Sequence, residues 1–319
     1  MKLFSSIRCV AVLTLSLGGV LIFQTNSLAA ETFTLDTARV AADKGDPEAE
    51  FFLARHYAHG QGVPRDYTQA IKFLRQAAQQ GYAPAQTGLG SCYANGRGVA
   101  QNYAEAVQWY RQAALQNDPL AEFCLGYAYA HGIGTLKDEK TALIWWQKAA
   151  DQGEVNAEYA LGEFYLYGEY PGDTNHINYA EAARWLGKAG EQDDAPAAGA
   201  LGYMYLYGVG VGQDWGKALQ WNRRAAELND PAGQDNLGQM YENGEGGLPH
   251  DLVQAYKWFW LSELQGNQFG EHDAIEIEMH HALTTQQIAE AKRLAAEFRS
   301  QLRASRPSAA LDDTTESVR

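Results

Sequence analysis

The sequence has little positive charge. It contains 25 Lys and Arg against 39 Asp and Glu, which gives a formal net charge of −14. Nucleic acids and anionic membrane surfaces both bind proteins through basic side chains. The composition therefore argues against both kinds of partner. It favours basic partners, whose association an acidic chain accelerates at low salt.

Cysteine is also scarce, with only three residues of this type. Cys9 lies in the N-terminal segment, which leaves Cys92 and Cys124. Both fall on apolar helix positions, in different registers of neighbouring repeats. We predict two buried free thiols, with a disulfide between them as the alternative, because disulfide geometry is demanding.

Motifs of catalysis are missing as well. The sequence contains neither S-x-x-K nor G-x-S-x-G, which mark acyl-transfer enzymes. Its Gly-x-Gly pairs lack the GK[ST] ending of a phosphate-binding loop. We therefore predict a non-enzymatic protein with no cofactor.

The N-terminus has the pattern of an export signal. Lys2 and Arg8 precede an apolar run over residues 9–23, and small residues follow at Ser27 and Ala29. This pattern predicts a signal peptide over residues 1–30, cleaved after Ala29 or Ala30, and a periplasmic or secreted protein. The alternative is an uncleaved anchor in the inner membrane. No cysteine follows the run, so a lipoprotein is not expected.

An eight-residue pattern, L-[GA]-x-x-Y-x-x-G, recurs six times. Its copies begin at Leu53, Leu89, Leu125, Leu161, Leu201 and Leu237. A Gly-x-Gly pair or a variant of it follows, then an Ala, an aromatic residue and usually a pair of small residues. Each unit therefore predicts a helix A, a glycine turn and a helix B. The fold predicted is all-α, an α-solenoid with a right-handed superhelix of six helix-turn-helix repeats.

Each predicted helix A carries a glycine, or once Ala54, directly after the leucine. A glycine inside a helix costs about 1 kcal/mol relative to alanine. We predict that the missing side chain lets helix A approach helix B closely, and that the small pair of helix B supplies the matching surface.

The ends of the array differ from the repeats. We expect an N-terminal capping helix in residues 31–46, the six repeats in residues 47–265 and C-terminal capping helices in residues 266–303. Thr284 and Gln287 have the spacing of a capping box at the last helix. Residues 304–319 lack apolar periodicity and predict a disordered tail.

Residues 85–114, AQTGLGSCYANGRGVAQNYAEAVQWYRQAA, carry the pattern almost throughout. They resemble the Sel-one-like repeat (SLR) family, a relative of the tetratricopeptide repeats. The resemblance implies an adaptor or scaffold that holds other proteins, and in exported bacterial members a role in signalling or envelope processes. A cysteine-rich branch of the family is linked to β-lactam binding, and this cysteine-poor chain departs from that branch.

In the related tetratricopeptide repeats, three positions of helix A line the binding groove. The resemblance places these partner-binding residues here at Phe123, Tyr127, His131, Tyr159, Glu163, Tyr167, Tyr203 and Tyr207, with Gly199 between them and Arg55, His59, Asn95, Asp235, Gln239 and Asn243 in the flanking repeats. Tyrosine and phenylalanine there would act as binding hot spots. The alternative is that the solenoid buries these rings between repeats.

Other residues have a structural and a functional interpretation. His59 and His131 share one repeat position and could sense pH or bind metal, although a helix C-terminus explains them better. His272, Glu276 and His280 recur every four residues, so one helix face could present a zinc site, with a solvated helix face as the simpler alternative. The clusters Trp145–Trp146 and Trp258–Trp260 could bind sugar, but packing is expected.

The sequence thus predicts a scaffold of the bacterial cell envelope that binds a protein segment or helix on its concave face. An envelope enzyme or a binding protein for peptidoglycan or β-lactams is the first alternative. Metal binding through the C-terminal His/Glu segment is the second.

Overall fold

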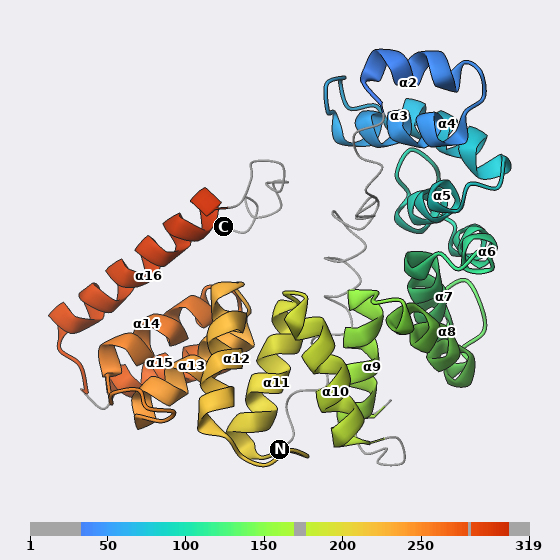
Figure 1. Cartoon of the computed structure of the whole chain (residues 1–319). Helices are drawn as coiled ribbons and strands as arrows, with labels where there is room; N and C mark the ends of the chain where they lie inside the picture. The colour runs from blue at the N-terminus through green and yellow to red at the C-terminus, as the bar shows by residue number, and fades with distance from the viewer. Residues whose placement is uncertain (1–32, 169–176, 280–281, 306–319) are drawn as a thin grey trace. The chain divides into compact units, whose positions relative to one another are not determined.

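The computed structural model describes residues 33–168, 177–279 and 282–305 (Figure 1). The predicted signal peptide and most of the predicted tail lie outside these residues. Throughout the described ranges the chain is helical and contains no strand. No described helix is both long and apolar enough to span a membrane.

The predicted all-α fold of six helix pairs is confirmed. Helices A of the repeats are α3 (Pro47–His59), α5 (Ala83–Asn95), α7 (Pro119–His131), α9 (Val155–Tyr167), α11 (Ala195–Tyr207) and α13 (Pro231–Asn243). Helices B are α4 (Tyr67–Gln79), α6 (Tyr103–Ala114), α8 (Glu139–Asp151), α10 (Tyr179–Glu191), α12 (Trp215–Glu227) and α14 (Leu252–Glu263). The flanking helices are α2 (Leu35–Ala42), α15 (Gln268–Met279) and α16 (Thr285–Ser305).

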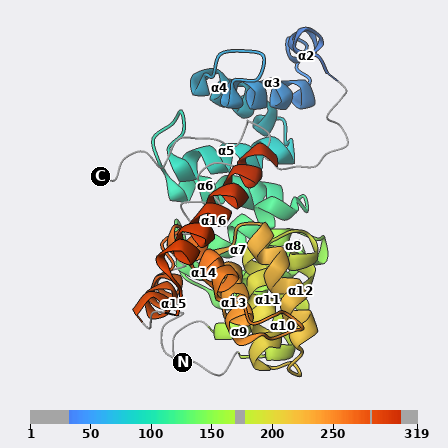
Figure 2. The ribbon, with the colours of Figure 1, turned by 90° about the vertical axis from the view of Figure 1, so that its left-hand side faces the viewer.

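The chain divides into two compact units, the first up to Ala157 and the second from Glu158. Within the first unit, α2 packs on α3, and each later helix packs on the one before it up to α8. Within the second, α10 to α15 pack in the same sequential order, and α16 returns to lie against α14 (Figure 2). Trp258 of α14 and Phe298 of α16 hold that contact edge to face, with ring centroids 5.1 Å apart.

Short polar motifs set the helix boundaries. Each helix B begins after an Asp or Asn whose side chain accepts a hydrogen bond from the first turn; Asn102, which replaces the usual Asp, accepts from the backbone N–H of Glu105 at 3.1 Å. Helix A ends at a glycine in the left-handed conformation, such as Gly60 with φ of 69°. The Gly-x-Gly turns are therefore helix C-caps rather than phosphate loops.

The glycine that follows the leucine of helix A lies where a side chain would collide with helix B. A Cβ atom built on Gly126 would be 2.6 Å from Trp146 and 3.1 Å from the carbonyl oxygen of Ala142. The close approach of the two helices is thus confirmed. The predicted partner is wrong, because large side chains of helix B fill this space in repeats two to six, except for Asn222 in repeat five.

The small pair of helix B packs instead on the following repeat. A Cβ atom built on Gly233 of α13 would be 2.3 Å from the Cβ atom of Ala225 in α12. Gly190 of α10 faces Ala198 of α11 in the same way. The Gly of helix A therefore sets the spacing within a repeat, and the small pair sets the spacing between repeats.

The ends of the array are closed as the sequence predicts. Leu35, the first residue of α2, packs against Gly62, where an added Cβ atom would be 2.8 Å from its side chain. In the same way Tyr67, the first residue of helix B in repeat one, packs against Gly98 of the next repeat. Helix α2 is therefore a helix B without its partner. At the other end, Thr284 and Gln287 form the expected capping box, with bonds of 2.9 and 3.3 Å.

Five repeats share a part-buried hydrogen bond that the sequence analysis did not predict. A glutamine one or two residues after the end of helix B donates its side-chain amide to a buried side chain in the first turn of helix A of the same repeat. The pairs are Gln80 with Glu50, Gln116 with Gln86, Gln152 with Glu122, Gln192 with Glu158 and Gln265 with Gln234, at 2.7–2.8 Å. In repeat five the corresponding residues are Ala198 and Leu228.

Candidate functional site

The helix-A face comprises the residues of helices A that the resemblance assigns to a binding groove. In the first unit, its aromatic part is on α7. Phe123 is only 5% exposed, and its ring contacts that of Tyr127, with ring centroids 6.4 Å apart. Tyr127 is half-buried, and its ring lies 4.2 Å from that of the exposed His131. Phe123 therefore offers no accessible surface, whereas Tyr127 and His131 do.

The histidines of this face end their helices. His59 is the last residue of α3 and His131 the last of α7. Desolvation lowers the pKa of both imidazoles, with further lowering by Arg55 and Arg97 at His59 and by Lys137 at His131. Neutral imidazoles gain little from the helix dipole, so the electrostatic benefit that their position suggests is opposed by their surroundings.

In the second unit, four tyrosines of α9 and α11 belong to the helix-A face. The hydroxyl of Tyr159 donates to Glu163 at 2.6 Å, one turn away. Tyr167 and Tyr207 are 43% and 51% exposed, and Tyr203 is half-buried beside Tyr207 with ring centroids 4.7 Å apart. These rings are accessible rather than sealed between repeats. Gly199 has a packing role, because a Cβ atom there would be 2.6 Å from the carboxylate of Asp230.

One hydrogen-bonded chain links α11, α13 and α15. The hydroxyl of Tyr207 donates to Oε1 of Gln239 at 2.6 Å. The Nε2 atom of Gln239 in turn donates to Oδ2 of Asp235 at 3.2 Å and lies 3.5 Å from Oδ2 of Asp273. Gln239 thus stands between two carboxylates from different helices. Asn243, the last flanking residue, is exposed at the end of α13.

The carboxylates around Gln239 form an acidic cluster, which we define as Asp235, Glu242, Asp273 and Glu276. Asp235 is 7% exposed, and its Oδ1 atom is buried with no hydrogen-bond partner. Burial, and then the charge of Asp273, raise the pKa of Asp235 to about 7. Burial also raises the pKa of Asp273 and of Glu242, and Glu276 adds repulsion to both.

This pKa predicts the pH dependence of stability. The ordinary pKa of Asp is 3.8, so the folded state holds a proton that the unfolded state has lost between roughly pH 4 and 7. The free energy of unfolding should therefore fall as the pH rises through this range. Asp235→Asn should raise it at pH 8 by about 1–3 kcal/mol and change it little at pH 4. Urea denaturation of both proteins at the two pH values measures the effect; equal stability at pH 8 would contradict it.

The predicted metal segment is partly described. His272 and Glu276 lie one turn apart on α15, with Nε2 and Oε1 3.5 Å from each other, and His280 lies outside the described residues. The structure adds Asp273, which brings three ligand atoms within 4.8 Å of one another. His272 and Glu276 are exposed on α15, as the solvated-face alternative predicts.

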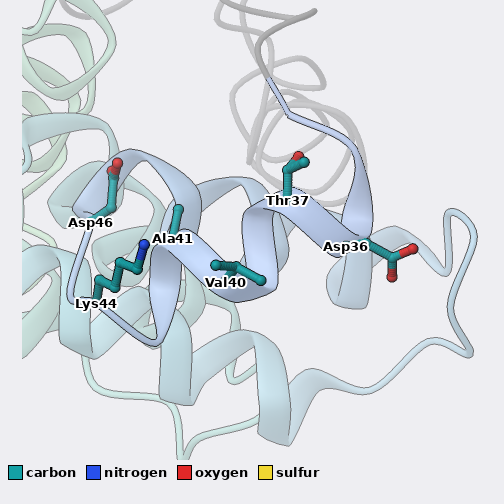
Figure 3. A pocket seen from close by; sticks show the side chains of 6 residues that line it. All are labelled: Asp36, Thr37, Val40, Ala41, Lys44 and Asp46. Carbon is teal, nitrogen blue, oxygen red and sulfur yellow. The ribbon is translucent and has the colours of Figure 1, made fainter.

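The remaining candidates are structural. Cys92 and Cys124 are buried free thiols, and burial raises the pKa of Cys92 to about 12 and also raises that of Cys124, which disfavours the nucleophilic thiolate in both. Trp146, Trp258 and Phe259 are buried and pack in the core, whereas Trp145 and Trp260 are half-buried, with Lys148 and Lys292 over their rings. A shallow pocket runs along α2 and the turn after it, lined by Asp36, Thr37, Val40, Ala41, Lys44 and Asp46 (Figure 3). It exposes only one large apolar side chain, Val40.

Stacked helix pairs with an aromatic and charged helix-A face define the class of α-solenoid interaction scaffolds. The Sel1 repeat model matches residues 47–82, 83–118, 119–154, 155–194, 195–230 and 231–267. The chain therefore belongs to the Sel1 repeat family, whose members generally mediate protein–protein interactions and are generally not enzymes. No curated protein matches the chain.

Two solved structures are similar in both sequence and fold. A protective antigen of uropathogenic Escherichia coli strains, with an SLR fold, is 34% identical with a TM-score of 0.70. That match covers 83% of this chain and 56% of the antigen, so the chain spans about half of its length. A Sel1 repeat protein from Oxalobacter formigenes is 30% identical with a TM-score of 0.64, over 73% of this chain and all of the other.

Proposed function

We propose that this protein is a non-enzymatic scaffold of the bacterial cell envelope that binds a protein partner on its helix-A face. The observation that carries the proposal is the accessibility of Tyr167 and Tyr207, which are among the few large apolar side chains exposed in the second unit. Exposed tyrosines in a rigid helical frame provide contact area at a small entropic cost.

The charges of the helix-A face support a protein rather than a small-molecule ligand. Arg55 on the helix-A face and Arg97 in the turn after α5 give part of the first unit a basic character, whereas Asp235 on the helix-A face and Asp273 of α15 give part of the second an acidic one. In the second unit, Tyr207 lies close to Asp235 and Asp273. Such a surface matches a protein segment that carries both apolar and charged side chains.

Export is proposed from the pattern of residues 1–30, namely positive charge, an apolar run and small residues before Ala30. The similar E. coli protein is a protective antigen with an SLR fold. For the present chain we infer export from its N-terminal pattern, together with a role in signalling or envelope assembly.

Loss of two exposed tyrosines should abolish partner capture. The full chain is used as bait in a periplasmic extract, beside the double variant Tyr167→Ala/Tyr207→Ala. Truncation of binding hot spots costs about 2 kcal/mol or more each, so recovery of the partner should fall at least tenfold. Quantitative mass spectrometry of the captured proteins measures the change.

Tyr179→Ala is the matched control, because Tyr179 is 39% exposed but belongs to helix B of the same unit. It should capture the partner as well as the unmodified protein does. Melting curves of all variants should coincide, which separates lost contact from lost fold. A double variant that still captures the partner in full would refute binding at the helix-A face.

A further inference from the structure

The acidic cluster of the second unit has no cation of its own among the described residues. Residues 231–279 contain nine Asp and Glu but a single Lys or Arg, Lys257. Its Nζ atom lies 4.0 Å from the ring centroid of Trp258, in contact with α14 and α16 rather than with the cluster. His272 is the one basic group that lowers the pKa of Asp273, and His250 does the same for Glu242.

Gln239 occupies the place of a cation in this cluster. Its Nε2 atom points an uncharged N–H donor at both Asp235 and Asp273, while its Oε1 atom is held by Tyr207. A single neutral amide does not satisfy two carboxylates. Oδ1 of Asp235 accordingly remains buried without a hydrogen bond, an arrangement that costs folding free energy unless a ligand completes it.

The aromatic ring of Tyr207 lies close to these carboxylates. Tyr207 is half-exposed, and its hydroxyl reaches the amide that separates Asp235 from Asp273. Carboxylates close to an aromatic ring are the usual surroundings of a guanidinium, which donates several parallel hydrogen bonds and can stack on such a ring. A metal ion would meet the N–H side of Gln239, since the amide oxygen already accepts from Tyr207.

We propose that the acidic cluster binds an arginine side chain of a basic segment in the partner, with the guanidinium displacing the amide of Gln239 from between Asp235 and Asp273 and stacking on Tyr207. This inference rests on the proposed function and specifies its partner chemistry. It accounts for the unsatisfied oxygen of Asp235, for the lack of a Lys or Arg at the cluster in the described part of the chain, and for the adjacent exposed ring.

A fluorescein-labelled peptide, acetyl-(Gly-Arg)₄-amide, tests the proposal by fluorescence anisotropy with the full chain at 50 mM NaCl. Asp235→Asn and Asp273→Asn should each weaken binding by about tenfold, because each removes a charge-assisted partner of the guanidinium. Gln239→Lys should weaken it as strongly, since it places a cation of the chain itself in the cluster. The last variant should also melt at a higher temperature.

Glu227→Gln is the matched control, because it removes the same charge from an exposed position at the end of helix B. It should change the affinity less than about twofold. Equal weakening by Glu227→Gln would show general attraction to an acidic protein and overturn the proposal. A peptide that does not bind would overturn it as well.

Metal is the other named outcome. If ZnCl₂ or CaCl₂ raises the melting temperature of the unmodified chain but not of Asp273→Asn, and the peptide fails to bind, the cluster is a metal site and the proposal falls. The proposed function is tested separately by the tyrosine variants. If partner capture depends on Tyr167 and Tyr207 but not on Asp235 and Asp273, the proposed arginine site is wrong, whereas binding of a partner at the helix-A face still stands.

Discussion

Gly202→Leu should lower the free energy of unfolding by about 3 kcal/mol or more, the upper part of the range for overpacked cores. A Cβ atom built on Gly202 would lie 2.2 Å from Oδ1 of Asn222 and 3.0 Å from its backbone nitrogen. The amide side chain can rotate away, but the backbone nitrogen cannot move unless α11 and α12 separate. Leucine adds three further carbon atoms to the same contact.

Urea denaturation followed by circular dichroism measures this loss. Gly187→Ala is the control, because Gly187 lies inside helix α10 and a Cβ atom there would meet only Leu201, at 3.8 Å. That substitution should stabilise the protein by about 0.5–1 kcal/mol, the difference in helix propensity. If Gly202→Leu were as stable as the original protein, helix A would not need glycine for its approach to helix B.

Gln152→Leu should destabilise the protein by about 2 kcal/mol, because it leaves a buried carboxylate without its donor. Gln152 donates to Oε2 of Glu122 at 2.7 Å, and Glu122 is buried at the start of α7. Burial already raises the pKa of Glu122, and Lys148 and Gln152 oppose that rise. Without Gln152 the carboxyl group must either bind a proton or stay charged in a poorly hydrated place.

The double variant Glu122→Ala/Gln152→Leu should recover at least half of this loss. It reproduces in repeat three the residues that repeat five already has, Ala198 and Leu228. Replacing both members of a buried hydrogen bond by apolar groups can be nearly neutral, whereas removing one exposes the full desolvation cost of the other. A double-mutant cycle in urea measures the coupling. A double variant less stable than Gln152→Leu would show that the bond itself, rather than its broken half, carries the stability.

The repeat architecture could be predicted because its determinants are local. Asn102 caps a helix through a hydrogen bond three residues along the chain, and Gly60 ends one through its own φ angle. The capping box of Thr284 and Gln287 also lies within four residues. A period that repeats such local elements therefore specifies the pairs and both ends of the array.

The contacts of the small residues that recur in each repeat were harder to predict. The spacing correctly indicated that Gly126 lies close to helix B, but not that Trp146 rather than an alanine pair would face it. The rotation of helix B about its own axis determines which of its side chains faces the glycine. A rotation by one residue would bring a neighbouring side chain to that place. The glutamine bonds to Glu50 and Glu122 were missed because their partners are thirty residues apart.

What the sequence by itself determined is the class of fold and the number of repeats, since these follow from hydrogen bonding and side-chain periodicity within one repeat. The helix-A face was assigned through the resemblance to the tetratricopeptide repeats. Only the tertiary structure decided that Phe123 is covered and Tyr207 is open, and that Asp235 and Asp273 share one glutamine. Desolvation and charge repulsion depend on distances between side chains of different repeats. No pattern within a single repeat contains those distances, so the acidic cluster became visible only once the helices were packed.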